Sequence, residues 1–405
     1  MLTETRCRYV ILGVVLGLLL LGRTADADGS VDLYGKTYRT DHLRRRVGSM
    51  DQIAGIRVVQ LDEANERPTR AALFHTGSGL EFTVLLDRCL DIAAASFQGK
   101  AMGWRSTTGD VAPQYYEPEG LRWLRSFYGG PLTTCGLTHV GAPSPEEPLL
   151  VNGLHGRIAN IPARNIKVAQ EWQGDDYVLS ITGTMRETTV FGENLTLTRT
   201  VSTKLGERRL WVRDVLKNEG FKETPYQILY HWNIGWPSVD DGSRLLAASR
   251  FVAPRDAEAV ADKENYNNFH APTHGYKEKV YYHDMVPEPD GTVTVAIINN
   301  GFDAGNGFGV YLKYNKNELP RFSQWKQMGE QDYVVGFEPA NCSVEGRQVD
   351  AALGLLHVLA PGEIKTFHFE FGPITSKQEL AAIRDAIPES DPQLVESYKE
   401  FVKKP

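Results

Sequence analysis

Short segments in which apolar residues fall on every second position place the strongest constraint on the fold of this chain. The segment YVLSITG puts Tyr177, Leu179 and Ile181 on one side of an extended backbone. The same period runs through NLTLTRTVST, TVTVAII and KTFHFEF, and Gly, Asn, Asp and Pro residues separate such segments. A two-residue period directs one face of a strand toward a core. The sequence therefore predicts many antiparallel strands, as in a large sandwich or barrel.

The domain organisation follows from the extent of this pattern. Between about residues 31 and 372 no sustained 3.6-residue period appears, so crossover helices and a parallel sheet are disfavoured. With 405 residues and no obvious linker, one large all-β domain over residues 28–375 is the simplest organisation. A capping box at Ser376–Glu379 and a second cap at Asp391 predict short C-terminal helices, so we expect residues 376–405 to form a helical extension packed on the domain.

The first 27 residues have the layout of a secretory signal peptide. Arg6 and Arg8 precede an apolar run over residues 9–21, and small residues follow at 25–27. The run is shorter than the roughly 20 residues that a membrane span needs. We therefore expect cleavage and a soluble protein exported to the periplasm or the cell exterior, without stable membrane insertion. A retained anchor is the alternative.

Charge and cysteine content exclude several classes of protein. The formal net charge of −7 weighs against a nucleic-acid partner, because phosphate binding favours a basic face. Beyond the signal, Cys89, Cys135 and Cys342 are too few and too scattered for a disulfide framework. We expect three buried thiols, and one bridge is the alternative. The spacing of His and Cys residues predicts no transition-metal site, and the presence of a structural cation is left open. The oligomeric state is left open.

Two histidine-containing segments stand out as candidate chemistry. In GLHGRIAN, His155 lies between Gly153 and Gly156 and precedes Arg157. Glycines on both sides would let the backbone approach a ligand closely, and the ring need not be packed, although a lone histidine between glycines is also typical of a turn.

In the second segment, LYHWNIGWP, His231 and Asn233 fall on the same side of a predicted strand, and Trp232 and Trp236 lie beside them. An imidazole, an amide and two indoles suit a sugar, whose hydroxyls need hydrogen bonds and whose C–H faces pack on aromatic rings. A hydrogen-bonded core histidine is the alternative.

A third segment, YVVGFEPAN, places a carboxylate at the end of an apolar strand. Glu338 follows strand-forming residues, and Pro339, which cannot donate to a ladder, is expected to end the pairing. Partial burial at the mouth of a pocket would raise the pKa of Glu338 toward that of a usable base. The alternative is a strand-end carboxylate in water.

Other polar and aromatic segments are less specific. In LLDRCLDI, Arg88 lies between Asp87 and Asp91, where an internal ion pair and a ligand clamp are both plausible. The glycine-rich segment 127–141 lacks phosphate-loop spacing and is interpreted as a loop with close backbone packing. Aromatic residues just before it, Trp123 among them, could form part of an aromatic wall.

Taken in order, LHGRIAN, YHWNIGWP and VVGFEPAN resemble the three signature stretches of the galactose mutarotase-like superfamily, the aldose 1-epimerases. The resemblance spans roughly residues 48–371, and the most similar branch is an uncharacterised bacterial aldose-epimerase-like domain family. It implies a large antiparallel β-supersandwich with a sugar in a cleft on one concave face. By matching motif positions, it implies Glu338 as the base, His231 as the acid, and His155 as a group that holds sugar oxygens. Arg88 would correspond to a substrate-binding arginine.

The resemblance implies an enzyme without metal or cofactor that opens a sugar ring, lets the aldehyde end rotate and closes the ring from the other face. Its partner would be a small carbohydrate, with Arg157, Asn233, Trp232 and Trp236 as further contacts. The same fold also carries lyases, glycoside hydrolases and non-catalytic sugar-binding domains, and these stay open as alternatives.

Overall fold

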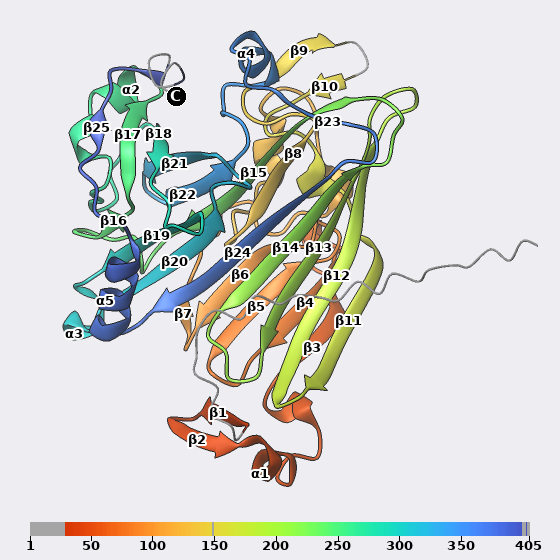
Figure 1. Ribbon diagram of the computed structural model, residues 1–405, viewed down its shortest axis with the longest axis vertical. Coiled ribbons are helices and arrows are strands. Elements are labelled where there is room, and N and C mark those ends of the chain that lie inside the picture. Colours follow the sequence, from red (N-terminus) through yellow and green to blue (C-terminus); the bar gives the residue numbers. More distant parts are fainter. Residues whose placement is uncertain (1–28, 148–149, 399–401, 403–405) are drawn as a thin grey trace, which may run out of the picture.

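Antiparallel strands dominate the computed structural model, which describes residues 29–147, 150–398 and 402 (Figure 1). The predicted signal peptide lies outside these residues. Two eight-stranded sheets and one five-stranded sheet supply most of the structure. The all-β prediction is confirmed, and β17–β25 is the only parallel strand pair within the described ranges.

The first eight-stranded sheet has the order β11-β12-β13-β14-β24-β20-β19-β16. Its strands are β11 (Arg164–Gln173), β12 (Asp176–Thr188), β13 (Asn194–Lys204), β14 (Leu210–Asn218), β16 (Arg244–Leu246), β19 (Thr292–Asn299), β20 (Phe308–Asn315) and β24 (Ile364–Ile374).

The second large sheet has the order β23-β15-β22-β21-β18-β17-β25, and β8 also pairs with β15. Its strands are β8 (Thr133–Leu137), β15 (Thr224–Ile234), β17 (Ser249–Pro254), β18 (Lys279–Met285), β21 (Arg321–Met328), β22 (Tyr333–Ala340), β23 (His357–Leu359) and β25 (Gln393–Leu394).

The five-stranded sheet runs in chain order. It comprises β3 (Gly55–Gln60), β4 (Arg70–His75), β5 (Leu80–Leu85), β6 (Asp91–Phe97) and β7 (Lys100–Ala101). Two separate hairpins are formed by β1 (Ser30–Leu33) with β2 (Lys36–Arg39), and by β9 (Ser144–Glu147) with β10 (Leu150–Asn152).

The helices are short. The α-helices are α1 (Thr40–Arg44), α2 (Ala257–Val260), α3 (Phe302–Gly305), α4 (Arg347–Ala352) and α5 (Lys377–Ala386). Single 3₁₀ turns cover Met50–Gln52, Ala64–Glu66, Pro113–Tyr115, Arg122–Ser126, Ile158–Asn160 and Lys263–Asn265. In the part of the chain that the structure describes, none of the helices is both long and apolar enough to cross a membrane.

The alternating segments form the strands expected of them. Leu179 and Ile181 of β12 are fully buried, whereas threonines on the other face of the sheet pair across strands, as between Thr182 and Thr200 at 2.9 Å. The largest apolar core joins all three sheets, with Phe82, Leu197 and Trp232 among its members. Cys89, Cys135 and Cys342 are buried free thiols, as predicted.

Two local predictions are wrong. The glycine-rich segment 127–141 contains a buried strand, β8, because the edge of β15 offers it a partner from Gln227 to His231. At the C-terminus, α5 forms with Ser376 as its cap, but the second expected helix does not begin at Asp391. Residues Gln393–Leu394 instead pair with β17, which covers the edge of the second sheet.

A buried ion network joins the three sheets and reaches β15 through the side chain of Tyr230. Arg199 of β13 is completely buried, and its guanidinium pairs with Asp91 of β6 at 2.5 Å and with Asp214 of β14 at 2.7 Å. Thr134 of β8 accepts a hydrogen bond from Arg199, and the hydroxyl of Tyr230 donates to Asp214 at 2.7 Å. One cation thus connects strands of all three sheets.

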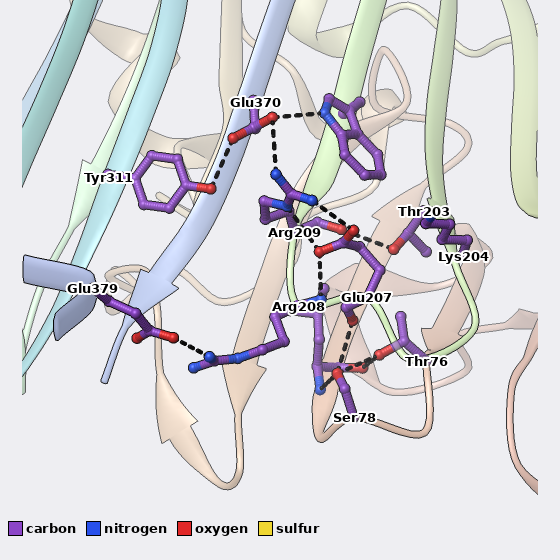
Figure 2. A network of polar contacts seen from close by, with 12 residues as sticks. Thr76, Ser78, Thr203, Lys204, Glu207, Arg208, Arg209, Tyr311, Glu370 and Glu379 are labelled. Atoms are coloured by element: carbon purple, nitrogen blue, oxygen red, sulfur yellow. Dashed lines mark hydrogen bonds and ion pairs between the residues drawn. The ribbon is translucent and has the colours of Figure 1, made fainter. Parts of the chain in front are cut away.

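A second network connects the turn between β13 and β14 to its surroundings (Figure 2). The carboxylate of Glu207 accepts hydrogen bonds from Arg209 at 2.8 and 2.9 Å, and its carbonyl accepts one from Ser78, between β4 and β5. The neighbouring Arg208 pairs with Glu379 in the first turn of α5. The turn therefore ties the five-stranded sheet and the C-terminal helix to the first large sheet.

We expect Glu207→Gln to lower the free energy of unfolding at neutral pH by about 1–2 kcal/mol. Burial raises the pKa of Glu207, but hydrogen bonds from Arg209 and the backbone of Arg208 outweigh it and bring the pKa below its ordinary 4.5. A lowered pKa stabilises the folded state above the unfolded pKa, and this contribution disappears as pH falls through the folded pKa. Urea unfolding measured at several acidic pH values should show the free energies of unfolding of the wild type and of Glu207→Gln converging as the pH falls.

Glu171→Gln on the exposed face of β11 is the control, and its free energy of unfolding should change little. Equal stability of Glu207→Gln and Glu171→Gln at neutral pH would contradict the prediction.

Candidate active site

His231 and Glu338 face each other across two neighbouring antiparallel strands. The pairs Leu229–Ala340 and Trp232–Phe337 share one register between β15 and β22, and this register puts His231 opposite Glu338. The Nε2 atom of His231 lies 3.2 Å from Oε1 of Glu338. Two motifs more than a hundred residues apart in the chain therefore form one contact.

Burial changes the ionisation of both groups. The side chains of His231 and Glu338 are 6% and 3% exposed. Burial raises the pKa of Glu338 to about 8, and the negative charge of Glu278 adds to this effect. Burial lowers the pKa of His231 to about 4. Both groups are thus neutral at pH 7, and the pair holds one proton over a wide range of pH.

A missing side chain makes room for this pair. Gly336 lies two residues before Glu338 on the same face of β22. A Cβ atom at Gly336 would come within 2.5 Å of the Glu338 carboxylate and 3.2 Å of the His231 ring. Glycine therefore allows the carboxylate and imidazole to approach each other over the surface of the sheet.

His155 joins this pair from a loop after β10. Its ring centroid lies 5.9 Å from that of His231, with the two planes nearly perpendicular. Burial lowers the pKa of His155 well below its ordinary value, and the nearby His231 adds to this shift. The flanking glycines serve close chain packing: a Cβ on Gly153 or Gly156 would collide with backbone carbonyls of Pro118 or His139. The ring itself is packed, because Trp123 contacts it at 4.9 Å between centroids.

Aromatic rings surround the histidines. Phe127 and Trp325 each lie 5.4 Å from His231 in edge-on contact, and Trp123 stacks on Phe127 at 4.5 Å. Trp104 extends this group through contacts with Phe127 and Trp325. Such rings exclude water from the polar pair and offer surfaces for the C–H faces of a sugar.

Trp325 and Glu278 are residues of the site that the sequence interpretation missed. The indole N–H of Trp325 donates to Glu278 at 2.8 Å, and Arg255 donates to the same carboxylate at 3.1 Å. Glu278 thereby fixes the ring that packs on His231 and brings a negative charge near Glu338. Trp325 lies opposite Gly336 in the β21–β22 register, a relation that only strand pairing reveals.

The expected end of the strand at Pro339 is wrong. β22 continues to Ala340, and Pro339 lies opposite Phe322 in the ladder with β21. Between β15 and β22 the ladder has no pairs at Glu338 and Pro339. The missing donor of Pro339 is therefore tolerated within the strand. Glu338 is 2% exposed, so a carboxylate in open water is excluded.

Arg88 lies away from the histidine–glutamate contact and holds loops together. Its fully buried guanidinium donates to the backbone carbonyls of Ala159, Val111 and Ser126. The last of these precedes Phe127 directly. The arrangement fits support of the loop that carries Trp123 and Phe127 rather than a clamp on a ligand.

The other predicted contact residues are distributed over both faces of β15 and beyond. Asn233 lies on the same side as His231 and donates to the carbonyls of Gly130 and His231. Trp232 points to the opposite side, where it packs on Phe369 and Phe371 in the main core.

Trp236 and Arg157 are not brought to the pair either. Trp236 is 59% exposed and contacts Phe302. Arg157 is exposed, and its backbone N–H donates to the carbonyl of Gly136. The structure therefore brings together His155, His231 and Glu338, with Asn233 beside them.

Comparisons with known proteins identify the family and the fold. Residues 66–372 match the family described as Domain of unknown function (DUF4432). A Klebsiella pneumoniae protein provisionally assigned as an aldose 1-epimerase has a TM-score of 0.79 at 23% identity, over 86% of this chain and 93% of its own. A galactose mutarotase-like protein from Clostridium acetobutylicum has a TM-score of 0.53 at 13% identity, over 80% and 99%. The curated proteins give no match. The protein therefore belongs to the DUF4432 family and has the galactose mutarotase-like fold.

Proposed function

We propose that this protein is an exported aldose 1-epimerase-like isomerase that interconverts the anomers of a small sugar by acid/base ring opening. The observation that carries the proposal is the buried contact of 3.2 Å between His231 and Glu338, in a setting that moves their pKa values apart. His155 and the aromatic rings around it would hold the sugar. The signal-like residues 1–27 support the export part of this proposal.

The chemistry needs one base and one acid together. The base takes the proton of the anomeric hydroxyl as the bond between C1 and the ring oxygen breaks, and the acid gives a proton to that oxygen. The aldehyde end then rotates and the reverse transfers close the ring with C1 inverted. At pH 7 the shared proton rests on Glu338, so the reaction uses the minor form in which it has moved to His231. In that form Glu338 is the base and His231 is the acid, and attraction between the two charges offsets part of the cost of forming it. The pair returns to the same protonation state after each turnover.

This arrangement predicts a bell-shaped dependence of kcat/KM on pH. Below about pH 4 the pair gains a second proton and has no base, whereas above about pH 8 it loses its last proton and has no acid. Anomeric exchange of free aldoses, followed by NMR across this range with the uncatalysed rate subtracted, checks the prediction. A kcat/KM that keeps rising above about pH 8 would contradict the shared-proton mechanism.

The same preparation separates the alternatives on this fold. An isomerase changes the anomer ratio of a free aldose without releasing new reducing ends. A lyase or hydrolase would release reducing ends from an oligosaccharide, and a binding protein would bind sugar without accelerating exchange. Either of the last two results, with no anomeric exchange in a panel of free aldoses, would overturn the proposal.

A further inference from the structure

A groove at one end of the first eight-stranded sheet lies outside the His231–Glu338 site. It is formed by the turns between β12 and β13 and between β14 and β15, which lie together because Leu195 pairs with Asn218. This is the end of the sheet near β23 in Figure 1. The groove has a volume of about 580 Å³, and its lining includes Arg164, Arg186, Thr189, Phe191, Phe221 and Lys222.

Two aromatic rings in this groove are almost completely exposed. Phe191 is 96% exposed and Phe221 is 97% exposed, and Val190 between the strands is 76% exposed. Clustered apolar side chains held in water are typical of an interaction site, since burying each would be favourable. The two phenylalanines come from different turns, so they present a bipartite aromatic surface.

The backbone at Phe191 adds an independent observation. Its φ angle is +67°, in the left-handed region that bulky residues rarely adopt. Gly192 follows directly and could have taken this conformation at lower cost. The turn thus holds an aromatic residue in an unfavourable conformation and directs it into water, a combination that points to a role in contact with a partner.

The polar lining of the groove is basic on a chain whose formal net charge is −7. Arg164, Arg186 and Lys222 contribute three cations, and all three residues are exposed. The single lining carboxylate, Glu193, is largely buried and accepts a hydrogen bond from Thr189. The lining therefore carries more positive than negative charge beside its aromatic rings, with the carboxylate of Glu219 near Arg186 outside the lining.

We propose that this groove is a second carbohydrate-binding site that takes an anionic oligosaccharide, with carboxylate groups on its sugar rings. Phe191 and Phe221 supply flat apolar surfaces for sugar C–H faces, the guanidinium groups of Arg164 and Arg186 can pair with carboxylates, and threonine hydroxyls meet the sugar hydroxyls. The site shares no residue with the His231–Glu338 pair, so the proposal stands independently of the proposed isomerase activity.

Calorimetric titration of the full chain with tetragalacturonate tests the proposal, with the neutral tetramer of galactose as the comparison. We expect binding of the acidic tetramer that weakens as sodium chloride is raised, and much weaker binding of the neutral one. The double variant F191A/F221A should bind about tenfold more weakly or worse. The charge variant R164Q/K222Q should lose the preference for the acidic tetramer.

Matched controls keep each result interpretable. Tyr34→Ala removes another exposed aromatic ring and Arg45→Gln another exposed cation, and both should bind tetragalacturonate as the wild type does. Glu338→Gln should also bind normally, because it changes only the other site. Thermal unfolding checks that each variant is folded.

Three outcomes would overturn the proposal: absent or salt-independent binding, equal affinity of wild type and F191A/F221A, or loss of binding in Glu338→Gln. Sedimentation velocity provides a fourth. A wild-type dimer that dissociates in F191A/F221A would show that the aromatic surface joins two copies of this chain and is not a sugar site.

Discussion

Replacing Glu338 by Gln should lower kcat for anomer interconversion by roughly 10²- to 10⁴-fold. The amide has nearly the same size as the carboxyl group but cannot take up a proton from the anomeric hydroxyl. Because burial raises the pKa of Glu338 to about 8, the carboxyl group is already neutral at pH 7 and the substitution should leave the fold intact. Polarimetry from a pure anomer, with the spontaneous rate subtracted, measures the loss.

The neighbouring histidine provides the companion measurement. His231→Ala removes the other member of the pair and should reduce the rate by a similar factor, while the double variant should be little slower than either single one, since the two groups act as a unit. Glu171→Gln on the exposed face of β11 is the control and should keep full activity. Wild-type rates in both Glu338→Gln and His231→Ala would remove the mechanism.

The largest loss of stability is expected for Arg199→Met, about 3–5 kcal/mol in the free energy of unfolding. The substitution deletes the only cation in direct contact with Asp91 and Asp214 among the described residues, and both carboxylates would stay buried. Burial already raises the pKa of Asp91. Without Arg199 the two acids would repel each other and lose their strongest partner.

Urea unfolding measures the change in the free energy of unfolding, and two further variants test its cause. Arg213→Met on the exposed face of the adjacent β14 should cost little. Removing the carboxylate charges together with the cation, in D91N/D214N/R199M, should recover part of the loss, since no unpaired charge is then left in the core. A cost near that of Arg213→Met would show that the network does not stabilise the fold.

Much of the fold could be predicted because its strands have one face in the core and one in water. The alternation in β12, β13 and β24 follows directly from that arrangement. β8 could not be found in the same way, because it is buried on both faces and its Gly136 weakens any strand pattern. The residues after Asp391 pair with β17 as β25, and Val395 and Tyr398 pack on the second sheet, although the sequence pattern alone also fits a helix.

The sequence predicts those residues of the candidate site that lie in recognisable motifs. His155, His231 and Glu338 belong to recognisable segments, and the two-residue period itself places Trp232 on the other face of β15 from His231. Trp325 and Glu278 could not be found, since nothing in the sequence states which strands are neighbours. Pairing of β21 with β22 is a property of the whole sheet, and it alone brings Trp325 to His231.

The shared register of β15 and β22 has a consequence for how relatives of this protein should be compared. A one-residue insertion within either strand, between its anchoring pairs and the reactive residue, would turn that side chain to the far face of the sheet. Such a relative would keep every signature residue in order and yet have its imidazole and carboxyl group on opposite sides. Intact motifs are therefore insufficient to transfer an activity within the family. An alignment without gaps across β15 and β22 is needed as well.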